Sequence, residues 1–282
     1  MPRQALIDTL RTRVEAVVLR TDPGRSLAPA PIPATGERAS ACSFSSSAPV
    51  AADWTFGSPE IDRFLPWRGL AAGGLHEVKP ETPADGPAAQ GLAAALLARR
   101  LAVASPPARP LLWAMTWRDI LETGRPYGPG LLSFGLVPAQ ILLVEARRDS
   151  EVLWALEEGL RSGALAAVAG GVGALGLTAA RRLALAAATY KTPCLLVTPA
   201  RQPGVSVAIS RWRVGAAPGS PHALDPALPA GLRFHLTLER CRGREAGRSW
   251  VVEWSDATFR FRLAPAVAGR AAAAELPRRR AG

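Results

Sequence analysis

The chain has 282 residues, of which 48% are hydrophobic, so it can bury a sizeable core and is not disordered along its whole length. Three widely spaced cysteines, Cys42, Cys194 and Cys241, form no CxxC motif. Neither a disulfide framework nor a zinc site follows from this spacing, and a reducing, cytoplasmic compartment fits best. The formal charge of +11 is almost all arginine and fits either a polyanion-binding surface or an arginine-rich coding bias.

Two segments precede the core. In residues 1–20, apolar positions from Ala5 to Val18 recur with a period near 3.6 and predict an amphipathic helix, which packs on the core or docks on a partner. This start carries acids and no cleavage-like site, and the chain has no run of 18 apolar residues, so we expect neither a signal peptide nor a membrane span. Residues 21–52, rich in proline, alanine and serine, predict a flexible linker.

The core, residues 53–264, begins with short apolar runs that alternate with helical ones. We expect strands at residues 75–78, 110–116, 140–145, 164–170 and 193–198. We expect helices at residues 88–104, 150–161 and 178–189, the last capped by Thr178. Continuous apolar strands that alternate with helices predict an α/β fold with a mainly parallel sheet covered on both faces.

The pattern changes towards the end of the core. Residues 232–240, 249–254 and 258–263 alternate like antiparallel strands, and the turn CRGREAG joins the first two into a hairpin. Residues 265–282 predict a basic, disordered tail.

Several local strings between Gly57 and Trp254 carry a family resemblance. GSPEIDRFLPWRGLAAGGLHEV, ILLVEARRDSEVLWALEEGLRSGAL and LLVTPARQ resemble successive parts of the RecA recombinase core. The whole, with SRWRV followed by RCRGREAGRSWVVEW, more closely resembles the ImuA family of RecA-related mutasome accessory proteins. The resemblance covers about 200 residues, carries no single invariant motif, and implies a RecA-like fold.

The phosphate loop of RecA-like ATPases has the pattern GxxxxGK[ST], whose backbone N–H groups and lysine hold the phosphates. The corresponding segment here is KPETPADGPAAQG. Aligned on Gly86, it has Glu81 for the first glycine, Pro87 for the lysine and Ala88 for the hydroxyl residue. Lys79 precedes the loop and does not replace that lysine. An acid at residue 81 would repel phosphates, and prolines remove N–H donors.

Two further positions depart from the ATPase pattern. The aspartate that supports Mg²⁺ falls on Gly171, and the glutamate that positions the attacking water falls on Trp117, although Asp119 and Glu122 lie nearby. We therefore expect no ATPase activity, cofactor or metal. We also predict that the Trp117 ring fills the space left by the nucleotide.

Direct DNA binding through interior loops is doubtful. The loops expected after residues 171 and 198 have only six or seven residues, which is short for wrapping a single strand.

Arginines mark a second candidate surface, for partner proteins or DNA. Arg240, Arg242, Arg244 and Arg248 flank the hairpin turn and either bind an anionic partner or form a solvated face. Arg211, Trp212 and Arg213 have the composition of an interface hot spot, although burial of Trp212 against the sheet is an equal alternative.

The resemblance implies a non-catalytic adaptor in SOS-induced translesion DNA synthesis. It would bind an ImuB-type, Y-family-like protein, help an error-prone polymerase and contact RecA itself. The alternatives are a divergent RecA-like ATPase or DNA-binding repair protein and a SulA-like inhibitor of cell division.

Overall fold

The computed structural model describes residues 54–103, 109–201, 206–220, 225 and 231–264. The expected N-terminal helix (1–20), the linker (21–52) and the basic tail (265–282) lie outside the described residues. Within the described ranges, no helix is both long enough and apolar enough to cross a bilayer.

One nine-stranded sheet runs through the described part of the chain, in the order β3-β2-β4-β5-β1-β6-β7-β8-β9. The strands β1 to β6 are mutually parallel, whereas β7, β8 and β9 each run antiparallel to the strand before. The strands, in order from β1 to β9, are Leu75–Pro80, Leu111–Thr116, Ile141–Ala146, Ala167–Gly171, Cys194–Val197, Ser210–Ala217, Arg233–Cys241, Ser249–Ser255 and Arg260–Leu263. The expected architecture, a mainly parallel sheet flanked by helices with a C-terminal antiparallel hairpin, is confirmed.

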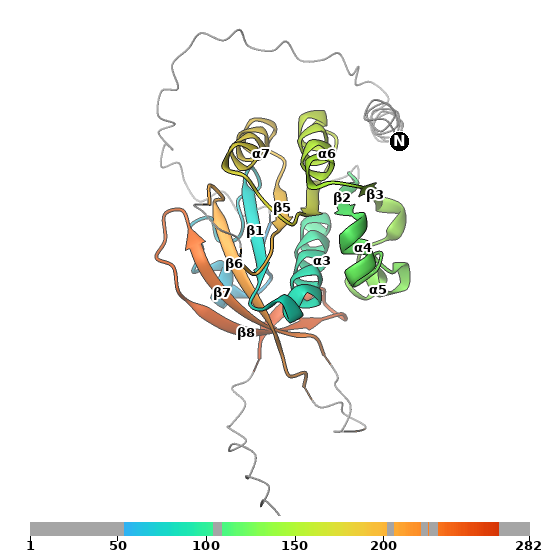
Figure 1. Ribbon diagram of the computed structural model, residues 1–282. Coiled ribbons are helices and arrows are strands. Elements are labelled where there is room, and N and C mark those ends of the chain that lie inside the picture. Colours follow the sequence, from blue (N-terminus) through green and yellow to red (C-terminus); the bar gives the residue numbers. More distant parts are fainter. Residues whose placement is uncertain (1–53, 104–108, 202–205, 221–224, 226–230, 265–282) are drawn as a thin grey trace, which may run out of the picture.

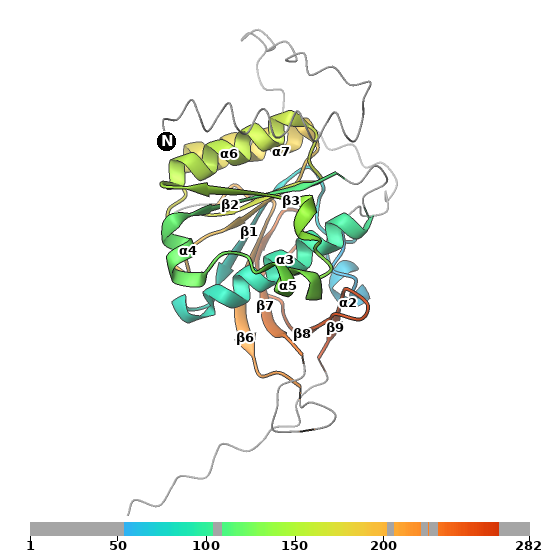
Figure 2. The same cartoon turned by 90° about the vertical axis from the view of Figure 1, so that its right-hand side faces the viewer.

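Helices cover both faces of the parallel half of the sheet, as Figures 1 and 2 show. On one face α6 and α7 pack over β1 to β5, and on the other α3 lies across the sheet with α4 and α5 beside it. The helices α2 to α7 are Pro59–Asp62, Gly86–Val103, Trp117–Thr123, Gly128–Ser133, Asp149–Ser162 and Leu177–Tyr190, and the short 3-10 helices are Pro83–Asp85 and Pro138–Gln140.

Burial explains the patterns of apolar and polar residues in the strands. Every residue of β1 and β2 is buried, because helices cover both faces there. In β2 this burial produces a continuous apolar run, whereas β1 also buries His76, Glu77 and Lys79. In β7 and β8, buried and more exposed residues alternate along most of the strand, because only one face meets the core. One core cluster lies under α3 and the antiparallel strands, and a second lies under α6 and α7.

Several local expectations needed correction. Helix α7 is capped by Gly176, so the expected cap, Thr178, is the second residue of the helix. Strand β6 and helices α4 and α5 were not assigned from the sequence. Strand β1 also extends through Pro80, two residues further than expected, and this extension changes the direction of Glu81.

Candidate functional site

The turn between β1 and α3 occupies the place where the sequence suggested a lost phosphate loop. The N–H and the Oγ1 hydroxyl of Thr82 both donate to Asp85 Oδ2, at 2.9 and 2.6 Å, and Asp85 N–H donates back to the Thr82 carbonyl at 3.0 Å. Asp85 Oδ1 accepts the N–H of Ala216 at 2.9 Å. The turn is thus closed around a carboxylate of its own.

The electrostatics of this turn follow from those contacts. The hydrogen bond from Ala216 N–H, and then the one from the Thr82 hydroxyl, hold the pKa of Asp85 below its ordinary value. Glu81 N–H donates to the Val214 carbonyl at 2.7 Å, so it too is engaged. Helix α3 follows directly, with Pro87 exposed and Ala88 packed against the core.

Glu81 does not take the position expected for it. Because β1 extends through Pro80, Glu81 continues the alternation of Glu77 and Lys79 and points to the same side of the sheet. Its Oε2 lies 3.4 Å from His235 Nδ1, and a Cβ on Gly215 would meet it at 2.4 Å. The carboxylate is therefore directed towards β6 and β7.

Gly171 ends β4 beside two polar side chains. A Cβ built on this glycine would lie 3.4 Å from Asp119 Oδ2 and 3.7 Å from Gln90 Nε2. Asp119 is the third residue of α4 and completes a capping box with the N-cap Thr116, because its Oδ2 accepts from the N–H and Oγ1 of Thr116, at 3.2 and 2.7 Å. Among the described residues, Gln90 Oε1 and Thr198 Oγ1 are buried without a hydrogen-bond partner.

The chemistry available at this end of the sheet is limited. No group of three or more histidine, cysteine, aspartate or glutamate side chains in the described ranges could hold a metal ion. Lys79, the one lysine near the turn, is 8% exposed and lies 3.2 Å from Glu239 Oε2, on the other side of β1 from His76.

Trp117 is not a plug, contrary to our expectation. It is the first residue of α4, its side chain points to solvent with 54% of the residue exposed, and the Arg147 guanidinium lies 5.7 Å from its ring centroid. The start of a helix at residue 117 turns the ring outward, away from the sheet.

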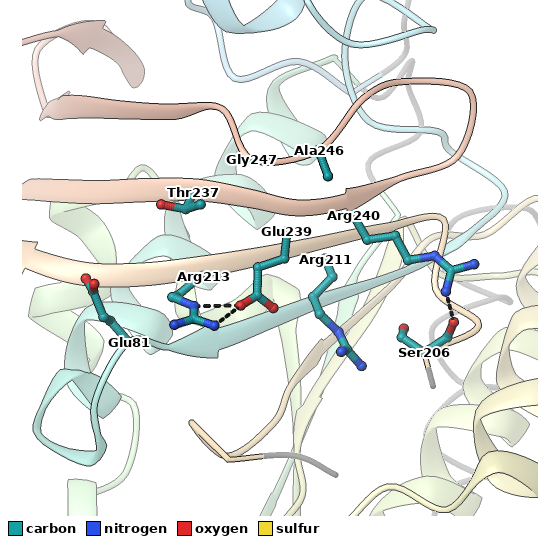
Figure 3. A pocket seen from close by; sticks show the side chains of 9 residues that line it. All are labelled: Glu81, Ser206, Arg211, Arg213, Thr237, Glu239, Arg240, Ala246 and Gly247. Carbon is teal, nitrogen blue, oxygen red and sulfur yellow. Dashed lines mark hydrogen bonds and ion pairs between the residues drawn. The ribbon is translucent and has the colours of Figure 1, made fainter. Parts of the chain in front are cut away.

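The second candidate surface lies on the open face of the antiparallel strands. A groove of about 1020 Å³ lies there. Figure 3 shows the side chains that line it on β6 and β7, namely Arg211, Arg213, Thr237, Glu239 and Arg240. Two of its arginines are paired with carboxylates: Arg211 Nε donates to Glu77 Oε2 at 2.6 Å, and Arg213 Nε to Glu239 Oε1 at 2.6 Å. Arg240 donates to the carbonyl of Ser206.

Trp212 faces away from this groove. It is 0% exposed, its ring lies 4.9 Å from that of Phe56, and its Nε1 donates to Ser210 Oγ at 3.0 Å. Of the two alternatives left open by the sequence, burial is the one observed, so Trp212 is a core residue.

The remaining turn arginines lie apart from the groove. Arg242, Arg244 and Arg248 are exposed in the β7–β8 turn. The Arg244 and Arg248 guanidinium carbons lie 5.9 and 4.9 Å from the ring centroid of Phe64, a residue far away in sequence. The structure thus separates the seven proposed surface residues into a paired groove set, a buried tryptophan and an exposed turn.

The roles of Asp85 and Thr82 were not predicted from the sequence. A signal was present, because Thr82 to Asp85 and Thr116 to Asp119 both have the spacing [ST]xx[DE], which marks a capping box.

Comparison with known proteins gives one clear sequence relationship. No family model matches the chain. Protein ImuA of two strains of Caulobacter vibrioides is 32% identical over 243 residues, which cover 80% of this chain and 94% of that protein. Among solved structures, the RadB recombinase matches with a TM-score of 0.49 and 13% identity, over 72% of this chain and 96% of its own.

Proposed function

This chain belongs to the ImuA family, and from that membership we propose that it is a non-catalytic adaptor in SOS-induced translesion DNA synthesis and mutagenesis. Family membership supports a role connected with DNA damage and a mutasome. In this proposal the chain binds an ImuB-type, Y-family-like protein and helps an error-prone polymerase to act at lesions. Contact with RecA is a further part of the proposal.

The observation that carries the non-catalytic part is the closed turn after β1. A phosphate loop works by presenting backbone N–H groups that have no other partner. Here the N–H groups of Glu81, Thr82 and Asp85 donate within the protein, and Pro83 and Pro87 have none to give. A phosphate would also have to approach the Asp85 carboxylate, which carries negative charge at neutral pH.

A divergent ATPase is the second candidate, and one observation favours it. Asp119 lies close to the end of β4, and Gln90 Oε1 and Thr198 Oγ1 are buried polar atoms without a partner in the described ranges. Ligands of open α/β sheets bind outside the carboxyl ends of the strands, where these groups lie. A nucleotide-dependent rise in melting temperature would favour this candidate over the adaptor.

Co-purification of the full chain with an ImuB-type protein tests the adaptor proposal. We expect a tagged chain to capture that protein from DNA-damaged cells, and to retain it after the nucleotides have been removed enzymatically. Truncations of residues 1–50 and 265–282 should show whether the ends of the chain contribute. Failure of the full chain to capture it, or capture only with added ATP, would contradict the proposal.

A further inference from the structure

The arginines of the β7–β8 turn differ from those of the neighbouring sheet face in how they are compensated. Arg211, Arg213 and Arg233 each bind a carboxylate on an adjacent strand. Arg242 and Arg244, in contrast, take part in no ion pair within the described part of the chain, and neither does Arg248. Their positive charge is therefore available to a partner.

These side chains are nevertheless held in place. The Arg248 guanidinium carbon lies 4.9 Å from the Phe64 ring centroid and 5.6 Å from that of Trp250, and Arg244 approaches Phe64 from its own position in the turn at 5.9 Å. A guanidinium that stacks on a ring keeps its N–H edge free to donate in the same plane. Stacking also reduces the side-chain entropy that binding would remove.

Two segments far apart in sequence form this surface. The loop after α2 supplies Phe64 and Pro66, and a Cβ on Gly243 at the tip of the turn would lie 3.8 Å from the ring of Pro66. Every residue from 242 to 248 is exposed, and Figure 1 places the turn at the outer end of the antiparallel strands. We call Phe64, Arg242, Arg244 and Arg248 the arginine ridge.

We propose that the arginine ridge binds the sugar–phosphate backbone of nucleic acid without regard to sequence. Guanidinium groups bind phosphate oxygens with two parallel N–H donors, and the exposed turn that joins β7 and β8 presents three of them on one surface. This contact goes beyond the adaptor function, because it brings the chain to DNA without a partner protein.

An acidic protein segment fits this part of the molecule less well. An acidic segment gains most from a concave basic site, and the groove beside the ridge is lined by Glu81 and Glu239, with Arg211 and Arg213 already paired with carboxylates. The β7–β8 turn that carries the ridge holds one acid, Glu245, beside its arginines. The turn therefore holds three exposed arginines that have no carboxylate partner among the described residues, and a phosphate backbone can reach them there.

Fluorescence anisotropy with the full chain tests the proposal, using a labelled duplex and a labelled single strand of unrelated sequences as probes. We expect binding of both, with similar affinity across sequences, that weakens as salt rises. In the double variant Arg244→Gln/Arg248→Gln, the slope of log affinity against log salt should fall by about 0.9 for each arginine on duplex and about 0.7 on single strand.

The matched control is Arg118→Gln/Arg125→Gln, which removes the same charge from side chains that are 59% and 64% exposed and lie beside acids. Its salt slope should stay close to the parental one. Equal loss in both double variants would overturn the proposal, since only net charge would then matter. So would the absence of salt-dependent binding to either probe, or a preference for a polyglutamate peptide over both nucleic acids.

A charge-conserving variant, Phe64→Leu, separates the supporting ring from the charges. We expect several-fold weaker binding with an unchanged salt slope, because the guanidinium groups lose their order and keep their charge. Binding at parental strength would contradict the role given to the ring. Thermal unfolding of each variant shows that the fold is retained.

Discussion

Asp85 closes the turn between β1 and α3, and Asp85→Ala removes three hydrogen bonds at once. The carboxylate accepts from Thr82 N–H, Thr82 Oγ1 and Ala216 N–H, at 2.9, 2.6 and 2.9 Å. Asp85 is the third residue of a capping box whose N-cap is Thr82. Loss of a capping side chain costs about 0.5–2 kcal/mol, and a hydrogen bond to a charged group contributes about 1.5–3 kcal/mol where it is shielded from water. Because Asp85 is partly exposed and water replaces some of these contacts, we expect a loss of about 1–2 kcal/mol.

Thermal and urea unfolding followed by circular dichroism measure that loss. For a domain of this size, each kcal/mol lowers the melting temperature by about 2–4 °C. Asp85→Asn keeps one acceptor oxygen without the charge and should give an intermediate value.

The pH dependence identifies the carboxylate as the source of the stabilisation. Hydrogen bonds from Ala216 and Thr82 lower the pKa of Asp85 in the folded state. Its contribution is therefore present above the unfolded pKa of about 4 and is lost as the pH falls through the lower, folded value. The gap between parent and Asp85→Ala should be constant near neutrality and shrink in acid. A parental melting temperature for the variant, or a gap that persists in acid, would refute this reasoning.

Burial raises the pKa of Asp62 to about 6, so the stability that this group contributes should be full below pH 4 and lost as the pH rises through 6. In Asp62→Asn, the free energy of unfolding, measured in urea across pH 4–8, should lack this decrease. Trp212→Ala should cost about 3–5 kcal/mol, whereas exposed Trp117→Ala should change stability by less than about 0.5 kcal/mol. Arg211→Ala should cost about 3–5 kcal/mol in the same assay because it strands a buried carboxylate, and unpaired Arg242→Ala should be nearly neutral.

Each of these comparisons has an outcome that would contradict it. An unchanged pH profile for the Asp62 variant would mean that its carboxyl is not desolvated as described. Equal losses of stability in the two tryptophan variants would contradict the burial of Trp212. Equal losses of stability in Arg211→Ala and Arg242→Ala would show that the ion pair of Arg211 with Glu77 does not stabilise the fold.

Much of the fold could be predicted because burial on both faces produces long apolar runs. The strands around residues 75, 111, 141 and 194 and helices α3, α6 and α7 lie close to their expected bounds. Strand β6 was missed because it carries Arg211 and Arg213 on one face, and their pairing with glutamates on β1 and β7 is a tertiary contact that spacing does not reveal.

Less of the candidate site could be predicted from the sequence. An ungapped reading placed Glu81 in the loop, but two more residues of β1 send it to the other side of the sheet. The sequence placed Trp117 beside the cleft, but the capping pair Thr116 and Asp119 starts a helix there and turns the ring to solvent. The contact of Phe64 with Arg244 and Arg248 joins segments that lie about 180 residues apart in the sequence. No local sequence pattern indicates such a contact.

Calorimetric titration of the full chain with ATP and Mg²⁺ tests the central claim most directly, namely that the turn closed by Asp85 leaves no place for a triphosphate. The account predicts no heat of binding when the nucleotide is in large excess over the protein. A saturable heat with a dissociation constant of about 1 μM, equivalent to about −8 kcal/mol, would contradict it.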